Sequence, residues 1–356
     1  MLSKKQLLEL KEHLEKAQNP IFYYDNDCDG LCSFLMIRRF LGRGKGVAVR
    51  SFPDLNRDYA RKAKELNADY VFILDKPIVS REFIEEINKL NLPIVWIDHH
   101  LIDSALDKEF NNISVFNPLR NKGDEKSEEP VTYLVYSALK RKEDLWLAII
   151  GCIADHFMPD FSDEFMKQYP EFWGNVKAPF DAYYNTEIGR IAQSFNFGLK
   201  DSTTNIVRLQ NFLIGCTGPN EVLAETTGNY YFRKKNNEIR KKYNSLFEKA
   251  QENVFGQAII FEYGGDLSIS ADLANELCYR NSEKYVAVIY KNGGICNVSL
   301  RGKNVRDLLE KIIRNLPSAS GGGHPDAAGA RIKIEDLEKF KKLLIEGISE
   351  NERSED

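Results

Sequence analysis

The sequence of 356 residues lacks several features that would assign it to a class at once. No run approaches the roughly 18 consecutive apolar residues of a membrane-spanning helix, so no membrane association is expected. None of its six cysteines forms a Cys-x-x-Cys pair, which excludes the spacing of a zinc finger. Because the N-terminal segment also lacks the apolar core of a signal peptide, we expect reduced cysteines and a cytoplasmic location.

An excess of one charge is also absent, since 49 lysines and arginines nearly balance 53 aspartates and glutamates. This balance excludes a polycationic tail that would hold nucleic acid by charge alone, but it leaves a local basic groove open. Histidine is scarce: four of the five histidines lie beside other chemically distinctive residues. The length exceeds that of one ordinary core and favours two domains.

Apolar runs alternate with amphipathic helical patterns up to residue 100. Strand patterns at 21–25, 47–52, 70–75 and 94–98 are separated by such helical segments. This rhythm predicts an α/β fold with a mostly parallel, doubly wound sheet and helices on both of its faces.

The rest of the sequence predicts a helical bridge and then a smaller α/β domain. We divide the chain into a first domain at 1–155, a helical insert with a linker helix at 156–255, and a C-terminal domain at 256–350. We interpret the aromatic residues at 169–184 as core and the basic start of the helix at 233–254 as a solvated face. Nucleic-acid binding is the alternative for both.

Three predicted strands end in an aspartate, and two of these aspartates are followed by further residues that can bind metals. The residues are Asp25 with Asp27 and Asp29, Asp75, and Asp98 with His99 and His100. A single aspartate at the end of a strand is often a turn residue or a helix cap. Three of them favour a common site, because the carboxyl ends of parallel strands meet at the edge of the sheet where ligands bind.

Carboxylates that converge at such an edge repel one another, by roughly 4 kcal/mol for a partly buried pair about 4 Å apart. Such a group needs cations. Oxygen ligands with an imidazole favour manganese or magnesium over a metal that prefers thiolates. Two ions about 4 Å apart are the usual apparatus for hydrolysing phosphate esters.

The run from Asp25 to Gly30 also matches the opening of a calcium-binding EF-hand loop. The twelfth position of that loop requires a glutamate and is Met36 here. The preceding segment is also predicted to be a strand and not a helix, so we reject the calcium loop.

Taken together, the motifs resemble the DHH phosphoesterase superfamily. They are DNDCDG at 25–30 with Ser33, Asp75, the triplet Asp98-His99-His100 and GCIAD at 151–155, followed by VSLR at 298–301 and GGGHPDAAG at 321–329. The resemblance covers 20–155 and 256–335, which it identifies as a DHH catalytic domain and a DHH-associated substrate-binding domain. It does not explain the stretch between them.

The resemblance implies a role for each acidic residue. Asp27 would bind one metal ion and Asp29 the other, and Asp75 would bridge both ions. His99 and Asp155 would complete the coordination of the second ion.

It also implies that Asp98 orients the histidine pair and that His100 faces the phosphate. Many members have a histidine where Tyr23 stands here, so the first ion would rely on Asp25 or water. His156, which follows Asp155, either supports the site or is a core histidine.

The glycine-rich segment at 321–323 has two interpretations. Alone it could be a flexible linker, but it runs directly into a compact turn and strand pattern. Three glycines, Gly321, Gly322 and Gly323, let backbone N–H groups approach a phosphate closely. His324 adds a donor and Arg301 offers a bidentate fork, so we expect this segment to bind substrate.

The sequence thus predicts a phosphodiesterase with two divalent ions, manganese or magnesium, that resembles the compact archaeal RecJ-like single-strand exonucleases. The substrate would be single-stranded DNA or RNA and the product a nucleoside 5′-monophosphate. Replication or repair proteins such as a helicase are the expected partners. The alternatives are a hydrolase of short oligonucleotides or cyclic dinucleotides, and a non-catalytic replication or repair scaffold, which only Tyr23 favours.

Overall fold

A parallel sheet with the strand order β2-β1-β3-β4-β5 forms the centre of the first half of the chain. The structure is a computed structural model that describes residues 1–50, 55–102, 105–121 and 127–353. The strands are β1 (Pro20–Asp25), β2 (Lys45–Val49), β3 (Tyr70–Leu74), β4 (Ile94–Ile97) and β5 (Ile113–Phe116). The predicted parallel sheet is confirmed, although positions 51 and 52 of the second predicted strand lie outside the described residues.

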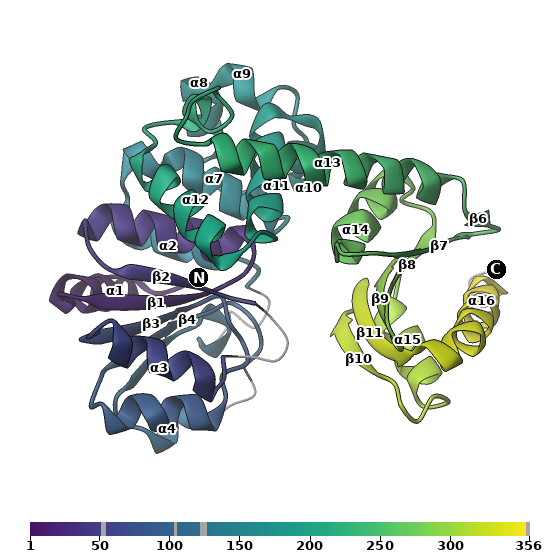
Figure 1. Cartoon of the computed structure of the whole chain (residues 1–356), viewed down its shortest axis with the longest axis horizontal. Helices are drawn as coiled ribbons and strands as arrows, with labels where there is room; N and C mark the ends of the chain where they lie inside the picture. The colour runs from purple at the N-terminus through teal and green to yellow at the C-terminus, as the bar shows by residue number, and fades with distance from the viewer. Residues whose placement is uncertain (51–54, 103–104, 122–126, 354–356) are drawn as a thin grey trace. The chain divides into compact units, whose positions relative to one another are not determined.

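Helices cover both faces of this sheet, as the doubly wound pattern predicts (Figure 1). One face carries α3 (Arg57–Glu65) and α4 (Arg81–Lys89), and the other carries α2 (Cys28–Leu41), α6 (Val131–Leu139) and α7 (Leu145–Ala154). Because side chains alternate along a strand, Tyr24 stacks on Phe34 of α2, whereas Tyr23 packs on the opposite face. The Tyr23 hydroxyl donates to the carbonyl oxygen of Tyr59 at 2.8 Å. Tyr23 therefore belongs to the packing of α3 and α4.

The segment after α7 is helical and shares the hydrophobic core on the α2 face of the sheet. Within the predicted aromatic stretch, Trp173 and Tyr183 are buried in that core. The remaining helices of this half are α1 (Lys4–Lys16), α5 (Leu106–Glu109), α8 (Ser162–Gln168), α9 (Pro170–Trp173), α10 (Pro179–Asn185), α11 (Glu187–Leu199) and α12 (Thr203–Gly215). Among the described residues, no helix combines the length and hydropathy needed to cross a bilayer.

The chain divides into two compact units, Met1–Asn237 and Glu238–Asp356, with the boundary inside helix α13 (Tyr230–Gln251). The second unit contains a mixed sheet with the order β10-β11-β9-β8-β7-β6. Its strands are β6 (Val254–Phe255), β7 (Ala258–Gly264), β8 (Tyr285–Asn292), β9 (Ile295–Arg301), β10 (Ser320–His324) and β11 (Ala327–Lys333). Its other helices are α14 (Ser270–Arg280), α15 (Val305–Ile313) and α16 (Leu337–Arg353), so the predicted second α/β domain is confirmed.

The glycine-rich segment forms an edge strand and not an irregular loop. Strand β10 pairs antiparallel with β11, and its glycines allow an unusually close approach between the two backbones. A Cβ atom at Gly321 would lie 2.5 Å from the carbonyl oxygen of Gly329, and one at Gly323 would lie 2.4 Å from that of Ala327. These glycines therefore serve strand pairing.

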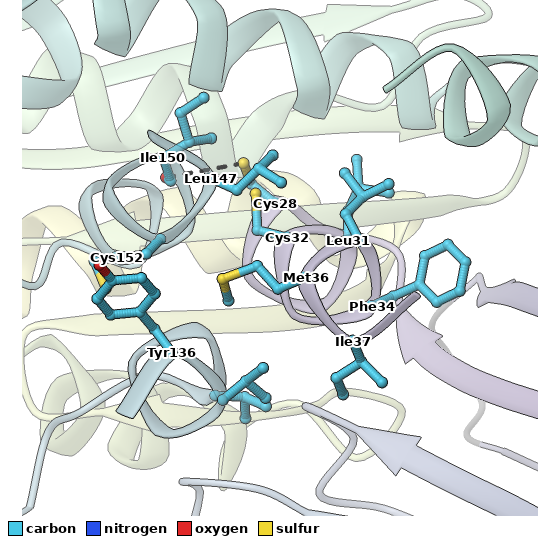
Figure 2. Close-up of a cluster of buried hydrophobic side chains, with 14 of the residues drawn as sticks. Cys28, Leu31, Cys32, Phe34, Met36, Ile37, Tyr136, Leu147, Ile150 and Cys152 are labelled. Atoms are coloured by element: carbon cyan, nitrogen blue, oxygen red, sulfur yellow. Dashed lines mark hydrogen bonds between the residues drawn. The ribbon is translucent and has the colours of Figure 1, made fainter. Parts of the chain in front are cut away.

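Helix α2 is buried along most of its length against α6 and α7. Figure 2 shows Cys28, Cys32 and Met36 of α2 beside Cys152 of α7 and Tyr136 of α6. All six cysteines are free. A very close approach occurs at Gly151, where a Cβ atom would lie 2.2 Å from Oγ1 of Thr132.

We expect Gly151→Ala to lower the free energy of unfolding by about 1–3 kcal/mol, because the added methyl group overpacks a buried contact between helices. Urea unfolding measures this change. Gly215→Ala at the end of α12 is the matched control, since nothing lies within 4 Å of a Cβ atom there. Equal stability of Gly151→Ala and the wild type would contradict the close contact.

Candidate metal centre

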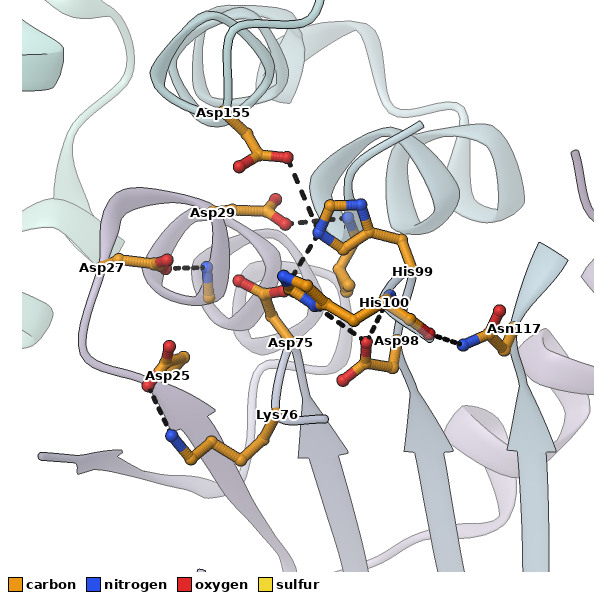
Figure 3. A network of polar contacts seen from close by, with 12 residues as sticks. Asp25, Asp27, Asp29, Asp75, Lys76, Asp98, His99, His100, Asn117 and Asp155 are labelled. Carbon is orange, nitrogen blue, oxygen red and sulfur yellow. Dashed lines mark hydrogen bonds and ion pairs between the residues drawn. The ribbon is translucent and has the colours of Figure 1, made fainter. Parts of the chain in front are cut away.

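Acidic and histidine side chains from separate segments lie together at the carboxyl ends of β1, β3 and β4 (Figure 3). Asp155, directly after α7, joins them. The gathered residues are those that the sequence analysis singled out, namely Asp25, Asp27, Asp29, Asp75, Asp98, His99, His100 and Asp155. Their convergence follows from the parallel sheet, whose strand ends share one edge.

Three of these side chains, those of Asp29, Asp75 and Asp155, lie around the imidazole of His99. His99 Nε2 lies 3.4 Å from Asp75 Oδ1 and 3.6 Å from Asp155 Oδ2. Asp29 offers a carboxylate oxygen within 4.8 Å of the ligand atoms of His99 and Asp155. Asp75 Oδ1 is buried and accepts no hydrogen bond from the described residues. Because leaving such an oxygen unsatisfied is costly, the site fits a divalent cation, for which either Asp75, His99 and His100 or Asp29, His99 and Asp155 have ligand atoms within 4.8 Å of one another.

The N-terminus of α6 fixes the carboxylate of Asp29. Its Oδ2 accepts from the Val131 N–H at 2.8 Å, and its Oδ1 accepts from the Thr132 N–H at 2.7 Å. The positive end of the helix dipole stabilises the negative charge at this position. Burial raises the pKa of Asp29 to about 6, although the hydrogen bonds from Thr132 and Val131 act in the opposite direction.

Asp27 is the N-cap of α2, and its Oδ1 accepts from the Gly30 N–H at 2.9 Å. Gly30 cannot be replaced easily, because a Cβ atom there would lie 2.6 Å from the carbonyl oxygen of Asp25. Burial, followed by the charges of Asp25 and Asp29, raises the pKa of Asp27 to about 7.

Burial also holds the pKa of Asp75 and of Asp155 well above the usual range, and the charges of Asp29 and Asp27 add to this effect. The charged form of these two carboxyl groups is therefore disfavoured, and a bound cation would compensate their charge.

A hydrogen bond between Asp98 and His100 orients the second imidazole. Asp98 Oδ1 accepts from the His100 N–H at 2.7 Å and lies 3.0 Å from His100 Nδ1. Burial alone would lower the pKa of His100, but the hydrogen bond with Asp98 and the charges of Asp98 and Asp155 raise it to about 9. His100 is therefore a cation at neutral pH, and its Nε2–H remains available as a donor.

Three residues of the site were missed in the sequence analysis. Lys76 Nζ lies 3.1 Å from Asp25 Oδ1, and Asn117 donates to the carbonyl oxygen of His100 at 2.8 Å. Both lie just beyond the end of a strand, which was a detectable signal. Thr132 binds Asp29 from 103 positions away, and no sequence pattern connects the two.

Asp25 and Asp27 lie apart from the closest ligand clusters. Neither belongs to the groups of described residues whose ligand atoms are near enough to share an ion. The roles implied for these two residues at a first metal site therefore stay predictions.

The residues expected to bind substrate come together in the second unit. Arg301 of β9 pairs in register with Ala327 of β11, which pairs with His324 of β10. Directly paired residues project from the same face of a sheet, so Arg301 and His324 flank the small side chain of Ala327. Arg301 also donates to Asn275 of α14.

Two family models match the chain. The N-terminal domain of the DHH family matches residues 21–155, and the DHHA1 domain matches residues 251–350. The chain therefore belongs to the DHH family of phosphoesterases, and its fold is RecJ-like. No curated protein matches the sequence significantly.

Solved structures show the same fold at low sequence identity. RecJ from Thermus thermophilus in complex with Mn²⁺ aligns with a TM-score of 0.60 and 14% identity, over 96% of this chain and 53% of that one. The chain thus spans about half the length of that RecJ. The DHH domain of a member of the S1p family of ribosomal proteins aligns with a TM-score of 0.67 and 12% identity, over 97% of this chain and 89% of that one. CDC45 from Entamoeba histolytica aligns with a TM-score of 0.53 and 12% identity, over 97% and 99% of the two chains.

The raised pKa values predict how pH affects the stability of the metal-free protein. The usual pKa of Asp27 is 3.8, and burial raises it to about 7. Between pH 3.8 and about pH 7, the folded state therefore holds a proton that the unfolded state has lost. The pKa of His100, raised from 6.5 to about 9, acts in the same direction at higher pH. Both contributions to stability are therefore lost as the pH rises.

We expect the increase in Tm on adding Mn²⁺ to be larger at pH 8 than at pH 5, because protons compete with the ion for the carboxylates. Thermal unfolding after EDTA treatment, with and without Mn²⁺, measures this difference. Asp27→Asn is the matched variant, since asparagine still caps α2 but cannot titrate. A pH-independent gain in Tm would contradict the proton competition.

Proposed function

We propose that the protein is a divalent-metal-dependent exonuclease that hydrolyses single-stranded DNA or RNA and releases nucleoside 5′-monophosphates. The observation that carries this proposal is the buried Asp75 Oδ1 beside His99 and Asp155. A cation bound there would supply Lewis-acid activation of the phosphoryl group. Manganese is the first choice and magnesium the alternative, because the ligands are carboxylate oxygens and an imidazole.

The other residues have separate tasks in this proposal. Asp98 holds His100 Nδ1, so that the Nε2–H can donate to a phosphoryl oxygen and stabilise the developing negative charge. Arg301 and His324 bind a phosphate group through charge-assisted hydrogen bonds. The glycines at 321–323 keep the backbone of β10 open to the same phosphate.

A cavity between α11, α12 and the start of α13 supports a polymeric substrate. It has a volume of about 450 Å³ and is lined by Asn205, Arg208, Tyr231 and Lys235 among others. The Tyr231 side chain is 55% exposed, and the Arg208 guanidinium lies 4.8 Å from the centroid of its ring. Exposed aromatic and basic side chains together suit stacked bases and backbone phosphates.

One hydrogen bond links the acidic segment to the helix that borders the cavity. Asn26, between Asp25 and Asp27, donates through Nδ2 to the carbonyl oxygen of Leu199 at 3.3 Å. The neighbouring Gly198 lines the cavity. Nucleotides adjacent to the cleaved bond could therefore occupy it.

The alternative substrate is a short oligonucleotide or a cyclic dinucleotide, which needs the same acids but not this cavity. A non-catalytic replication or repair scaffold is disfavoured, because Tyr23 packs away from the acids and its identity no longer counts against metal binding. A helicase or another replication partner stays a prediction.

We expect Asp75→Asn to abolish hydrolysis of end-labelled single strands with Mn²⁺ or Mg²⁺. Asparagine preserves the shape of the side chain and tolerates the φ of 55° at this position, which alanine does not. Asp163→Asn in the first turn of α8 is the control and should retain full activity. Full activity of Asp75→Asn, or of the wild type in EDTA, would contradict the metal-dependent mechanism.

We expect Tyr231→Ala to weaken binding of a ten-nucleotide strand by about tenfold or more and binding of a dinucleotide much less, because stacking contributes roughly 1–3 kcal/mol per base. Fluorescence anisotropy in the Asp75→Asn background measures binding without turnover. Arg190→Ala, which removes an exposed arginine of α11, is the control. If dinucleotides bind best and Tyr231→Ala has no effect, the short-oligonucleotide function is favoured.

A further inference from the structure

Strand β2 lies at one edge of the parallel sheet, and among the described residues it pairs with β1 alone. Its other side presents backbone N–H and C=O groups that no described strand uses. The Gln210 side chain donates to the carbonyl oxygen of Gly46 at 3.4 Å, so the backbone groups of Gly46 point away from β1. Backbone groups alternate in direction along a strand, and those of Ala48, two residues further on, therefore point the same way.

A groove with a volume of about 550 Å³ follows this edge. Helix α3 forms one wall and α12 the other, with α2 between them (Figure 1). The apolar part of the lining comprises Phe34, Val47, Leu66, Ile206 and Val207. Val207 is 42% exposed and Leu66 is 37% exposed. An added strand would thus find both backbone partners and apolar side chains beside β2.

The charged residues of the groove are mostly basic. They are Arg38, Lys45, Arg50 and Lys62, against one acidic residue, Asp58. Arg38 is partly buried near the end of α2 and forms no ion pair with a described residue. Burial lowers the pKa of its guanidinium group, and no neighbouring charge offsets this effect. Lys45 is exposed and also forms no ion pair with a described residue. The groove therefore favours an acidic occupant.

The basic end of the groove lies away from the metal centre. Lys45 begins β2, whereas the acidic residues follow the carboxyl ends of the neighbouring strands. Arg38 lies roughly 13 Å beyond Asp29 along the axis of α2. Nucleic acid also lacks the alternating N–H and C=O groups that pair with a strand edge. A polypeptide therefore fits this groove better than the substrate of the metal centre does.

We propose that the groove binds an extended acidic segment of a partner protein, which pairs with β2 and directs carboxylates to Arg38 and Lys45. Main-chain hydrogen bonds to the edge supply affinity, while the cations and the apolar walls select the sequence. This docking surface does not depend on the proposed metal-dependent function, because none of its residues belongs to the metal centre.

The probe is a fluorescein-labelled peptide of ten residues, with four alternating valines and threonines between three glutamates on each side. Fluorescence anisotropy with the full-length protein should show saturable binding that weakens as salt is added, because salt screens the exposed charges. Peptides with lysines in place of the glutamates, or with N-methyl groups on the central amides, should not bind.

We expect Arg38→Gln to weaken binding of the glutamate peptide about tenfold, because a hydrogen bond to a charged group is lost. Lys64→Gln, at an exposed lysine of α3 outside the groove, is the matched control and should bind like the wild type. Ala48→Pro should abolish binding, since it removes an N–H of the open edge, where a strand tolerates proline.

If Ala48→Pro does not fold, Val207→Asp at an exposed position still decides, because its charge should repel the glutamates and weaken binding. The proposal is wrong if the glutamate peptide does not bind saturably, if the lysine peptide binds equally well, or if Arg38→Gln and Val207→Asp both bind normally. Binding of a ten-nucleotide dT strand that requires Arg38, or self-association that Ala48→Pro abolishes, would also overturn it, by assigning the groove to nucleic acid or to a second copy of the chain.

Discussion

The site depends on the repulsion between carboxylates that a parallel sheet brings to one buried edge. Most of them receive local compensation: Asp29 from the N-terminus of α6, Asp27 from Gly30, Asp25 from Lys76 and Asp98 from His100. Asp75 and Asp155 receive less compensation of their negative charge. Burial and the neighbouring negative charges hold the pKa of each well above its usual range. The remaining electrostatic cost is what a divalent cation would remove, so the chemistry follows from an imbalance that the fold creates.

The helices on the α2 face place the acids that the strands do not carry. Asp29 lies in the first turn of α2, and Asp155 follows α7. Their relative position depends on the packing of α2, α6 and α7, where the Ser33 hydroxyl lies 3.2 Å from the Thr132 hydroxyl and Gly151 admits no larger side chain. The buried core in Figure 2 is thus continuous with the metal centre, and a packing change in it would move a ligand.

Much of the fold and of the candidate site could be predicted from the sequence. Alternating strand and helix patterns predicted the parallel sheet, and aspartates at the ends of its strands predicted which side chains converge. Features that depend on direction or on long-range pairing were not accessible. The sequence cannot show that Tyr23 faces α3, since that depends on the register of β1, or that the glycines at 321–323 pair with β11. It also could not show that Lys76 turns inward to Asp25, because a lysine after a strand is usually solvated.

The central claim is that the cluster around His99 exists to bind a divalent cation. The most direct measurement is a crystal structure of the protein grown with Mn²⁺, with anomalous diffraction recorded at the manganese edge. The account predicts an anomalous peak within ligand distance of Asp29, Asp75, His99 and Asp155. A peak elsewhere, with these four side chains in contact only with one another, would contradict it.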